Sequence, residues 1–209
     1  MPSQVSQRLD TCTPCDSAVA LLRRFQPSIL KGWTPVFVAG DGNCLFRAVS
    51  LAMFGTQELH KELRFLACLE IGENTALYDP ESSACHSLLR RYDIVAPALP
   101  ELIREVSSAG TSCCVAALVA LSSVLQIPIS SYYPPISSSF VAPLTVDIVG
   151  RGVDSKKRGI AVMWSTVGPT SGESIDINHV VPMINKPYQD SPFREQIICT
   201  SNNDNGMLL

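Results

Sequence analysis

The chain has 209 residues, a length that favours one folded domain with terminal tails over two domains that each need a core. Hydrophobic residues make up 46% and charged residues 17%, which is typical of a globular protein and unlike a disordered chain. The formal net charge of −3 argues against nucleic-acid binding through phosphate neutralisation, so no nucleic-acid partner is expected.

The N-terminus has no basic start followed by an apolar run, so no secretory signal is predicted. No stretch approaches the roughly 18 consecutive apolar residues of a membrane span, so no membrane association is expected. The eight cysteines are dispersed through the chain rather than arranged as a small disulfide framework. We therefore expect reduced thiols in an intracellular protein, cytoplasmic or nuclear.

Residues 1–15 are polar and are predicted to form a flexible arm, ahead of one domain over 16–185 and a polar tail over 186–209. Asp16 and Ser17 favour a helix start, and the apolar positions that follow end before Pro27. An apolar strand is predicted at 36–38. It runs into the turn-rich residues 39–43.

Helical periodicity dominates the middle of the chain. Apolar residues at 45, 48, 49, 52 and 53 share one face, and Gly55 is a natural stop. A second helix is predicted from near Thr56 to 72–74, and a third around 99–106. The fourth, around 114–125, is apolar on all sides and should be packed from several directions. The second helix is expected to bury Leu59, Leu63, Leu66 and Ala67.

Strands dominate the last part, at 127–133, 140–149, 159–164 and 179–184. Residues 150–158 carry four basic side chains and are predicted to be a solvated hairpin tip: Arg151, Lys156, Lys157 and Arg158. Helices first and strands later indicate an α+β domain, with helices covering a small, mostly antiparallel sheet.

Cys44 differs from the other cysteines because it lies where the turn-rich loop passes into a helix. A helix N-terminus presents unpaired N–H groups and a partial positive charge, which favour a thiolate and can stabilise an oxyanion. Gly42 lets a substrate approach the backbone closely, and Asp41 or Asn43 can cap the helix or hold the loop. The position alone also fits a small, buried structural cysteine.

Three short runs of residues together suggest a family. They are Asp41-Gly42-Asn43-Cys44-Leu45-Phe46-Arg47-Ala48, His60-Lys61-Glu62-Leu63-Arg64 and Asn178-His179-Val180-Val181-Pro182. The first resembles the nucleophile motif of ovarian-tumour (OTU) family cysteine proteases, the second the next helix of that family, and the third its histidine strand. The resemblance covers roughly residues 35–185 and is strongest to the OTU-like domains of vertnin and of transposon-linked animal proteins.

This resemblance implies a papain-like OTU fold and a deubiquitinase that hydrolyses isopeptide bonds of ubiquitin, or of a ubiquitin-like modifier, without a cofactor. Cys44 is then the nucleophile that forms an acyl-enzyme, and His179 takes its proton and later protonates the leaving amine. Asp41 matches the aspartate of the family motif. It is expected to shape the loop and oxyanion hole around Gly42 and Asn43.

The histidine strand departs from the family pattern at one position. OTU enzymes commonly place Asp or Asn two residues after the histidine to orient its ring, and this chain has Val181 there. Asn178, Asp176 and a backbone carbonyl are the alternatives, although Asn178 and His179 point to opposite faces of a regular strand. A missing orienting group lowers the rate rather than abolishing the chemistry.

Two functions from different classes therefore remain open. The first is a working deubiquitinase, favoured by the Cys44–His179 pair; the second is a catalytically weak OTU-fold module that binds ubiquitin or another protein, favoured by Val181. A metal is not expected. Cys12 and Cys15 have the spacing of half a zinc site, but a structural site needs four ligands.

Overall fold

The computed structural model describes residues 12–92, 94, 96–136, 145–171 and 175–189. The α-helices are α2 (Asp16–Phe25), α3 (Cys44–Phe54), α4 (His60–Glu73), α5 (Thr75–Tyr78), α6 (Leu99–Ser107) and α7 (Val115–Leu125). Short 3₁₀ turns lie at Pro27–Lys31, Ser83–Ser87 and Arg90–Tyr92. The strands are β1 (Thr34–Pro35), β2 (Ile129–Tyr132), β3 (Val146–Ile148), β4 (Ile160–Ser165) and β5 (His179–Ile184).

The five strands form one sheet in the order β1-β5-β4-β2-β3. Only the β2–β4 pair is parallel among the described strands, and the other three pairs are antiparallel. This confirms the predicted α+β class with a small, mostly antiparallel sheet. The hairpin predicted for 150–158 is wrong, because β2 lies between β3 and β4 and the segment crosses from one side of β2 to the other.

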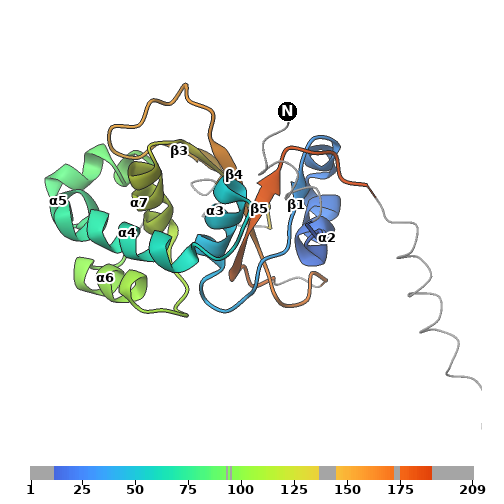
Figure 1. Cartoon of the computed structure of the whole chain (residues 1–209), viewed down its shortest axis with the longest axis horizontal. Coiled ribbons are helices and arrows are strands. Elements are labelled where there is room, and N and C mark those ends of the chain that lie inside the picture. Colours follow the sequence, from blue (N-terminus) through green and yellow to red (C-terminus); the bar gives the residue numbers. More distant parts are fainter. Residues whose placement is uncertain (1–11, 93, 95, 137–144, 172–174, 190–209) are drawn as a thin grey trace, which may run out of the picture.

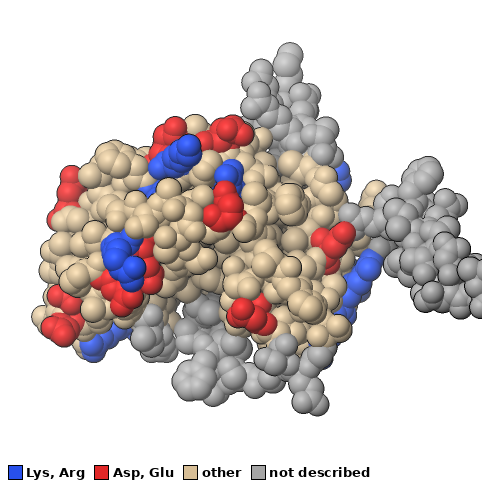
Figure 2. Space-filling model, turned by 90° about the horizontal axis from the view of Figure 1, so that it is seen from below, with Lys and Arg blue, Asp and Glu red and all other residues tan. Residues whose placement is uncertain are grey.

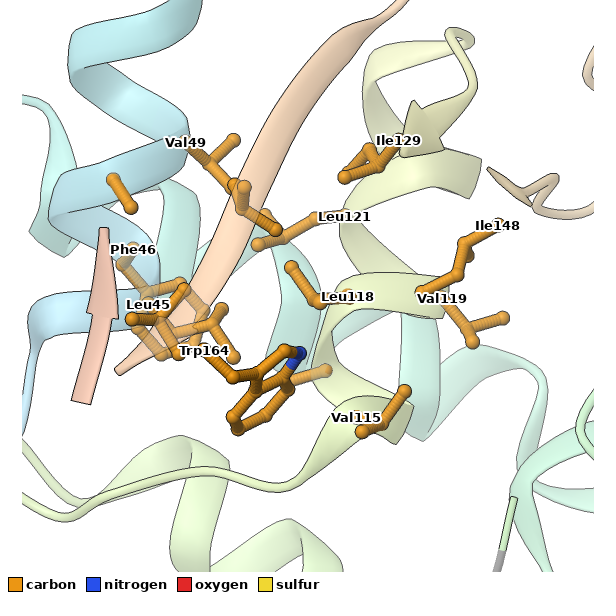
Figure 3. Packing of buried hydrophobic residues seen from close by; sticks show 14 of the residues in the cluster. Leu45, Phe46, Val49, Val115, Leu118, Val119, Leu121, Ile129, Ile148 and Trp164 are labelled. Atoms are coloured by element: carbon orange, nitrogen blue, oxygen red, sulfur yellow. The ribbon is translucent and has the colours of Figure 1, made fainter. Parts of the chain in front are cut away.

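The helices lie on both sides of the sheet, with α4 to α7 gathered at one end and α2 beyond β1 at the other (Figure 1). On one face, Trp164 of β4 lies among apolar side chains of α3 and α7 (Figure 3). Strand residues alternate between faces, so the next residue, Ser165, turns the other way. Its hydroxyl lies 3.3 Å from that of Ser17 in α2.

Helices α3 and α7 supply much of the core between them. Phe46 of α3 and Leu118 and Leu121 of α7 are fully buried, as Figure 3 shows from close by. The all-round apolar character of α7 is explained by this packing, since Val115 to Ser123 are all buried. The buried residues of α3 lie between Cys44 and Leu51, so the core anchors the N-terminal part of the helix. Its first residue, Cys44, is therefore fixed in position.

Several predicted elements differ in their bounds. Helix α4 begins at His60 rather than near Thr56, and its Leu66 is 40% exposed where burial was predicted. The strand predicted at 36–38 is misplaced, because β1 covers Thr34–Pro35, Val36 forms only an isolated bridge and Phe37 is 55% exposed. Phe37 lengthens the apolar run in the sequence, although its side chain does not belong to the core.

The folded part begins a few residues earlier than the predicted arm allows. Pro14 forms a β-bridge with Val36, and the amide of Phe37 donates to the carbonyl of Thr13. Residues 13–15 thus protect the outer edge of β1. Most of the predicted arm (1–11) and tail (190–209) lies outside the described residues.

An ion pair between a buried carboxylate and a half-exposed guanidinium closes the C-terminal end of α4. The Arg151 guanidinium donates to both carboxylate oxygens of Glu70, at 3.1 and 2.7 Å, and Tyr78 donates to the same carboxylate at 3.3 Å. Burial is the main cause that raises the pKa of Tyr78. Arg151 is therefore not simply a solvated cation of a loop tip, as predicted, but a partner of a carboxylate that is 7% exposed.

No described helix has the length and apolar character needed to cross a membrane. On the face shown in Figure 2, acidic and basic side chains are interspersed among broad uncharged areas.

Candidate active site

Cys44 is the first residue of α3, directly after the loop of residues 39–43. Its side chain is almost completely buried, with 5% of the residue exposed. The backbone amides of Val180 and Leu45 point at the thiol and lower its pKa, as expected beside a helix N-terminus. Burial is the larger effect and raises the pKa above its ordinary value, with a further contribution from the Asp41 carboxylate. The resting residue is a neutral thiol.

His179 is the first residue of β5 and is 3% exposed. Burial lowers the pKa of its imidazole, and the backbone of Val38 and the charge of Asp41 act in the opposite direction. Its Nδ1 atom is buried without a hydrogen-bond partner among the described residues. A Cβ added to Gly40 would lie 3.7 Å from this atom, so the loop before Cys44 packs against the ring.

The fold brings Cys44 and His179 to the same end of β5. The thiol of Cys44 accepts from the Val180 amide, and Val180 directly follows His179. Within the described part of the chain, no hydrogen bond joins the two side chains themselves. Apo active sites are often loose in this way and tighten when a substrate binds.

Asp41 is held by Arg47, one turn into α3. The Arg47 guanidinium donates to both carboxylate oxygens, at 3.1 Å from Nε to Oδ1 and 2.7 Å from Nη2 to Oδ2. These bonds hold the pKa of Asp41 well below its usual range, so the carboxylate stays charged. Asp41 therefore braces the loop. It adds negative charge near both Cys44 and His179.

Gly42 and Asn43 fasten the loop to the connection between α6 and α7. Gly42 has φ of +76°, and a Cβ there would collide with the Gly110 carbonyl. The Asn43 side-chain carbonyl accepts from the Gly110 amide at 3.0 Å, and the Asn43 amide donates to Asp41 at 3.1 Å. The Asn43 amide is thus engaged with Asp41, and the Cys44 amide acts on its own thiol, whose pKa it lowers.

Residues 35–165 match the model of a family described as the OTU domain of vertnin. The chain belongs to this family. A comparison with curated proteins gives no significant match.

Solved structures that resemble this chain are themselves OTU domains. The OTUD1 OTU domain is 19% identical with a TM-score of 0.51, over 80% of this chain and 94% of that one. The OTU protease of Farallon virus is 20% identical with a TM-score of 0.46, over 76% and 88% of the two chains. The Hazara virus OTU, solved bound to ubiquitin, is 12% identical with a TM-score of 0.45, over 75% and 83%. The likeness to the OTUD1 domain shows the fold.

The two side chains considered for orienting His179 are engaged elsewhere in this OTU domain. The Asn178 side-chain carbonyl accepts from the Val167 amide at 3.2 Å, and its amide donates to Asp176 at 3.1 Å. Val181 is fully buried and has no polar group to offer. Val38 is the backbone group placed against the ring, which corresponds to the third alternative, a backbone carbonyl.

Arg47, Gln57 and His60 form a supporting network that the sequence did not reveal. Arg47 Nη1 lies 3.4 Å from His60 Nδ1, which is 2.8 Å from the Gln57 carbonyl. The Gln57 side chain in turn accepts from the Ala39 amide at 3.4 Å. The sequence signal that could have indicated this network is His60, which opens the run of residues 60–64. Its contact with Arg47 depends on how α4 packs against α3.

The described residues contain no cluster of three or more potential metal ligands. All seven described cysteines are free thiols, and Cys15 is buried beneath the bridge between Pro14 and Val36.

Proposed function

We propose that this OTU domain is a thiol-dependent hydrolase that cleaves isopeptide bonds of ubiquitin or of a ubiquitin-like modifier. The observation that carries the proposal is the meeting of Cys44, at a helix N-terminus, with His179, whose buried Nδ1 has no partner in the described structure. Nothing in this mechanism calls for a cofactor, and the proposed setting is intracellular, cytoplasmic or nuclear.

Because burial raises the pKa of Cys44 and lowers that of His179, the resting pair is a neutral thiol beside a neutral imidazole. His179 then acts as a general base, taking the thiol proton as sulfur attacks the scissile carbonyl. The Cys44 amide stabilises the oxyanion. The imidazolium next protonates the leaving lysine amine, and water hydrolyses the thioester through the same two groups.

In this proposal the Val38 carbonyl orients the imidazole in place of a side chain. Asp41 contributes negative charge that favours the imidazolium formed during the reaction. Since the hydrogen bonds from Arg47 hold the pKa of Asp41 well below its usual range, this contribution is present at neutral pH.

A second function, binding without efficient cleavage, is favoured by specific observations. The thiol pKa is raised rather than lowered, no hydrogen bond joins Cys44 to His179 in the described structure, and Val181 is apolar. Such a module would bind ubiquitin through the same face and turn over slowly.

A ubiquitin bearing a C-terminal electrophile separates the two functions. We expect the native chain to form one covalent adduct, mapped by mass spectrometry to Cys44, and the Cys44→Ala variant to form none. Cys68→Ala is the matched control, because this partly exposed thiol lies in α4 and its loss should leave the adduct unchanged. A folded native chain that binds ubiquitin but gives no adduct would support the binding module. An adduct on Cys44→Ala would overturn the nucleophile assignment.

A further inference from the structure

Arg64 is a buried cation without a carboxylate beside it. It lies in the second turn of α4 and is 5% exposed, and among the described residues it forms no ion pair. Burying a charge is costly unless hydrogen bonds compensate for the lost water. A set of backbone carbonyls takes the place of a counter-ion here.

Most of these carbonyls belong to the end of α6 and to the connection that follows it. Arg64 Nη1 donates to the carbonyls of Glu105 and Ser108, at 3.0 and 2.9 Å, and Nη2 donates to that of Thr111 at 2.8 Å. The last carbonyls of a helix are unpaired and carry partial negative charge. The guanidinium therefore caps α6. This explains how it remains charged without an acidic partner.

The remaining acceptor belongs to the loop that precedes Cys44. Arg64 Nη2 donates to the Gly42 carbonyl at 2.9 Å, and the guanidinium carbon lies 4.4 Å from the centre of the Phe46 ring. Gly42 and Phe46 flank Cys44 by two residues on either side. One rigid, planar group thus contacts the backbone before the nucleophile and the side chain after it.

A second link runs parallel to the first. The bond from the Gly110 amide to Asn43 joins the same two loops, which also touch where Gly42 meets Gly110. Glycine peptides rotate readily, and rotation of the Gly42–Asn43 peptide would break the bonds to Arg64 and to Asp41 together. The positive φ of Gly42 is therefore held from outside the loop.

We propose that Arg64 is a positioning residue that fixes the Gly42–Asn43 peptide, and with it the N-terminus of α3, against the C-terminus of α6 and residues 108–113. Its kinetic consequence rests on the proposed function, whereas its structural consequence does not. Loss of Arg64 displaces the amides around Cys44 while the rest of the core stays packed.

The test compares Arg64→Met and Arg64→Lys with Arg151→Met, which removes the arginine contact to the buried Glu70 of α4. Hydrogen exchange followed by mass spectrometry should show residues 41–47 and 108–113 exchanging about tenfold faster or more in Arg64→Met. Arg151→Met should leave those segments unchanged and release residues 70–78 instead. Arg64→Lys, which keeps the charge but loses the planar fork, should give an intermediate effect.

With a hydrolysable ubiquitin substrate, kcat per folded molecule should fall about tenfold to a hundredfold in Arg64→Met, with KM changed less than about threefold. Arg151→Met should leave both unchanged. If Arg64→Met does not fold, Arg64→Lys carries the test and should still speed exchange at 41–47. Asn43→Ala, which removes the parallel link and a 3.4 Å bond to the Asp41 carbonyl, shows how much that link contributes.

The variants Arg64→Met and Arg151→Met are to be compared under conditions of equal loss of melting temperature. If residues 41–47 then exchange at the same rate in both, the inference is overturned. If the native chain hydrolyses nothing while the exchange pattern is as expected, the proposed function fails and the positioning role stands. If the native chain hydrolyses the substrate and Arg64→Met keeps its kcat, the proposed function stands and the positioning role fails.

Discussion

Two polar clusters on α4 are built in opposite ways. At its C-terminal end, Glu70 pairs with Arg151 and Tyr78, so charge meets charge and the acceptors are filled. At its N-terminal half, Arg64 donates to backbone carbonyls and to the Cys113 sulfur, and its guanidinium lies over the Phe46 ring. The described structure has two buried side-chain nitrogens without a partner, Arg64 Nε and His179 Nδ1, and both lie around the nucleophile loop. A buried polar group without a hydrogen bond lowers the stability of the fold, so this cost is concentrated around the loop before Cys44.

The largest effect should follow from removing the base. His179→Ala should lower hydrolysis of a ubiquitin substrate by about 10⁴-fold or more, because the thiol then has no proton acceptor. Stability should fall by only about 1–2 kcal/mol, because the cavity left by the buried ring and the lost contact with Val38 are partly offset by removal of a nitrogen without a partner. Steady-state kinetics with thermal melting checks this, and hydrolysis within tenfold of the native rate would exclude His179 as the base.

The protonation of the site can be read from pH. Because the pKa of Cys44 is raised above its ordinary 9.0, its alkylation by iodoacetamide should rise about tenfold per pH unit from pH 7 to beyond pH 9. A thiolate–imidazolium pair would instead give a plateau reaching below pH 6. Peptide mapping separates Cys44 from the other thiols, and such a plateau would contradict the neutral resting pair.

Disrupting the Glu70–Arg151 ion pair should change the stability of the fold and leave the labelling of Cys44 unaltered. Glu70→Gln removes the charge that Arg151 neutralises and should cost about 2–3 kcal/mol, below the usual range for breaking a buried pair because half of the Arg151 side chain faces solvent. Urea unfolding measures the loss. Probe labelling of Cys44, normalised to folded protein, should be unchanged, and reduced labelling would mean that the two clusters are coupled.

Val181→Asn tests whether the ring already has its orienting group. The side chain at 181 is fully buried on the histidine side of β5, so an amide there should cost about 1–3 kcal/mol. If the Val38 carbonyl orients His179, kcat should rise by no more than about twofold. A tenfold rise would show that the orienting group is missing from the native chain.

The smallest effect is expected at Asn178. Its side chain bonds to the Val167 amide and to Asp176 at the surface, so Asn178→Ala should cost about 0.5–1 kcal/mol and change kcat less than about threefold. Kinetics and thermal melting measure both. A loss of kcat near a hundredfold would return Asn178 to the role of orienting group.

The elements with a strong local signal could be predicted from the sequence. Helix α3 was bounded by the turn residues before Cys44 and by Gly55, whose φ of +70° is the left-handed cap expected of glycine. Helix α7 followed from its continuous apolar run. Residues 75–92 were not assigned, because one short helix and two 3₁₀ turns carry too few residues for a period to emerge.

Features set by distant residues could not be predicted. The order of the strands depends on which faces the helices cover, and a basic loop alone does not reveal that β3 and β4 are separated by β2. In the site, Cys44 and His179 stand in recognisable motifs, whereas the contact of Val38 with the His179 ring is made by its backbone and leaves no mark on residue choice. In the sequence, Arg64 stands out only as the last residue of the run 60–64. Its acceptors are carbonyls, which every residue has.

The strand order has a consequence for how the protein is made. Strand β5 lies between β1 and β4, so the nucleophile helix near the start of the chain lacks its main sheet partner until residue 184 has been synthesised. A nascent chain leaving the ribosome therefore carries α3 and α7 with their apolar faces uncovered, a state that favours chaperone binding. It also carries Cys44 without His179. Strand β5, the last of the described strands to emerge, completes both the sheet and the proposed Cys44–His179 pair, so we expect chains that stop before it to be inactive.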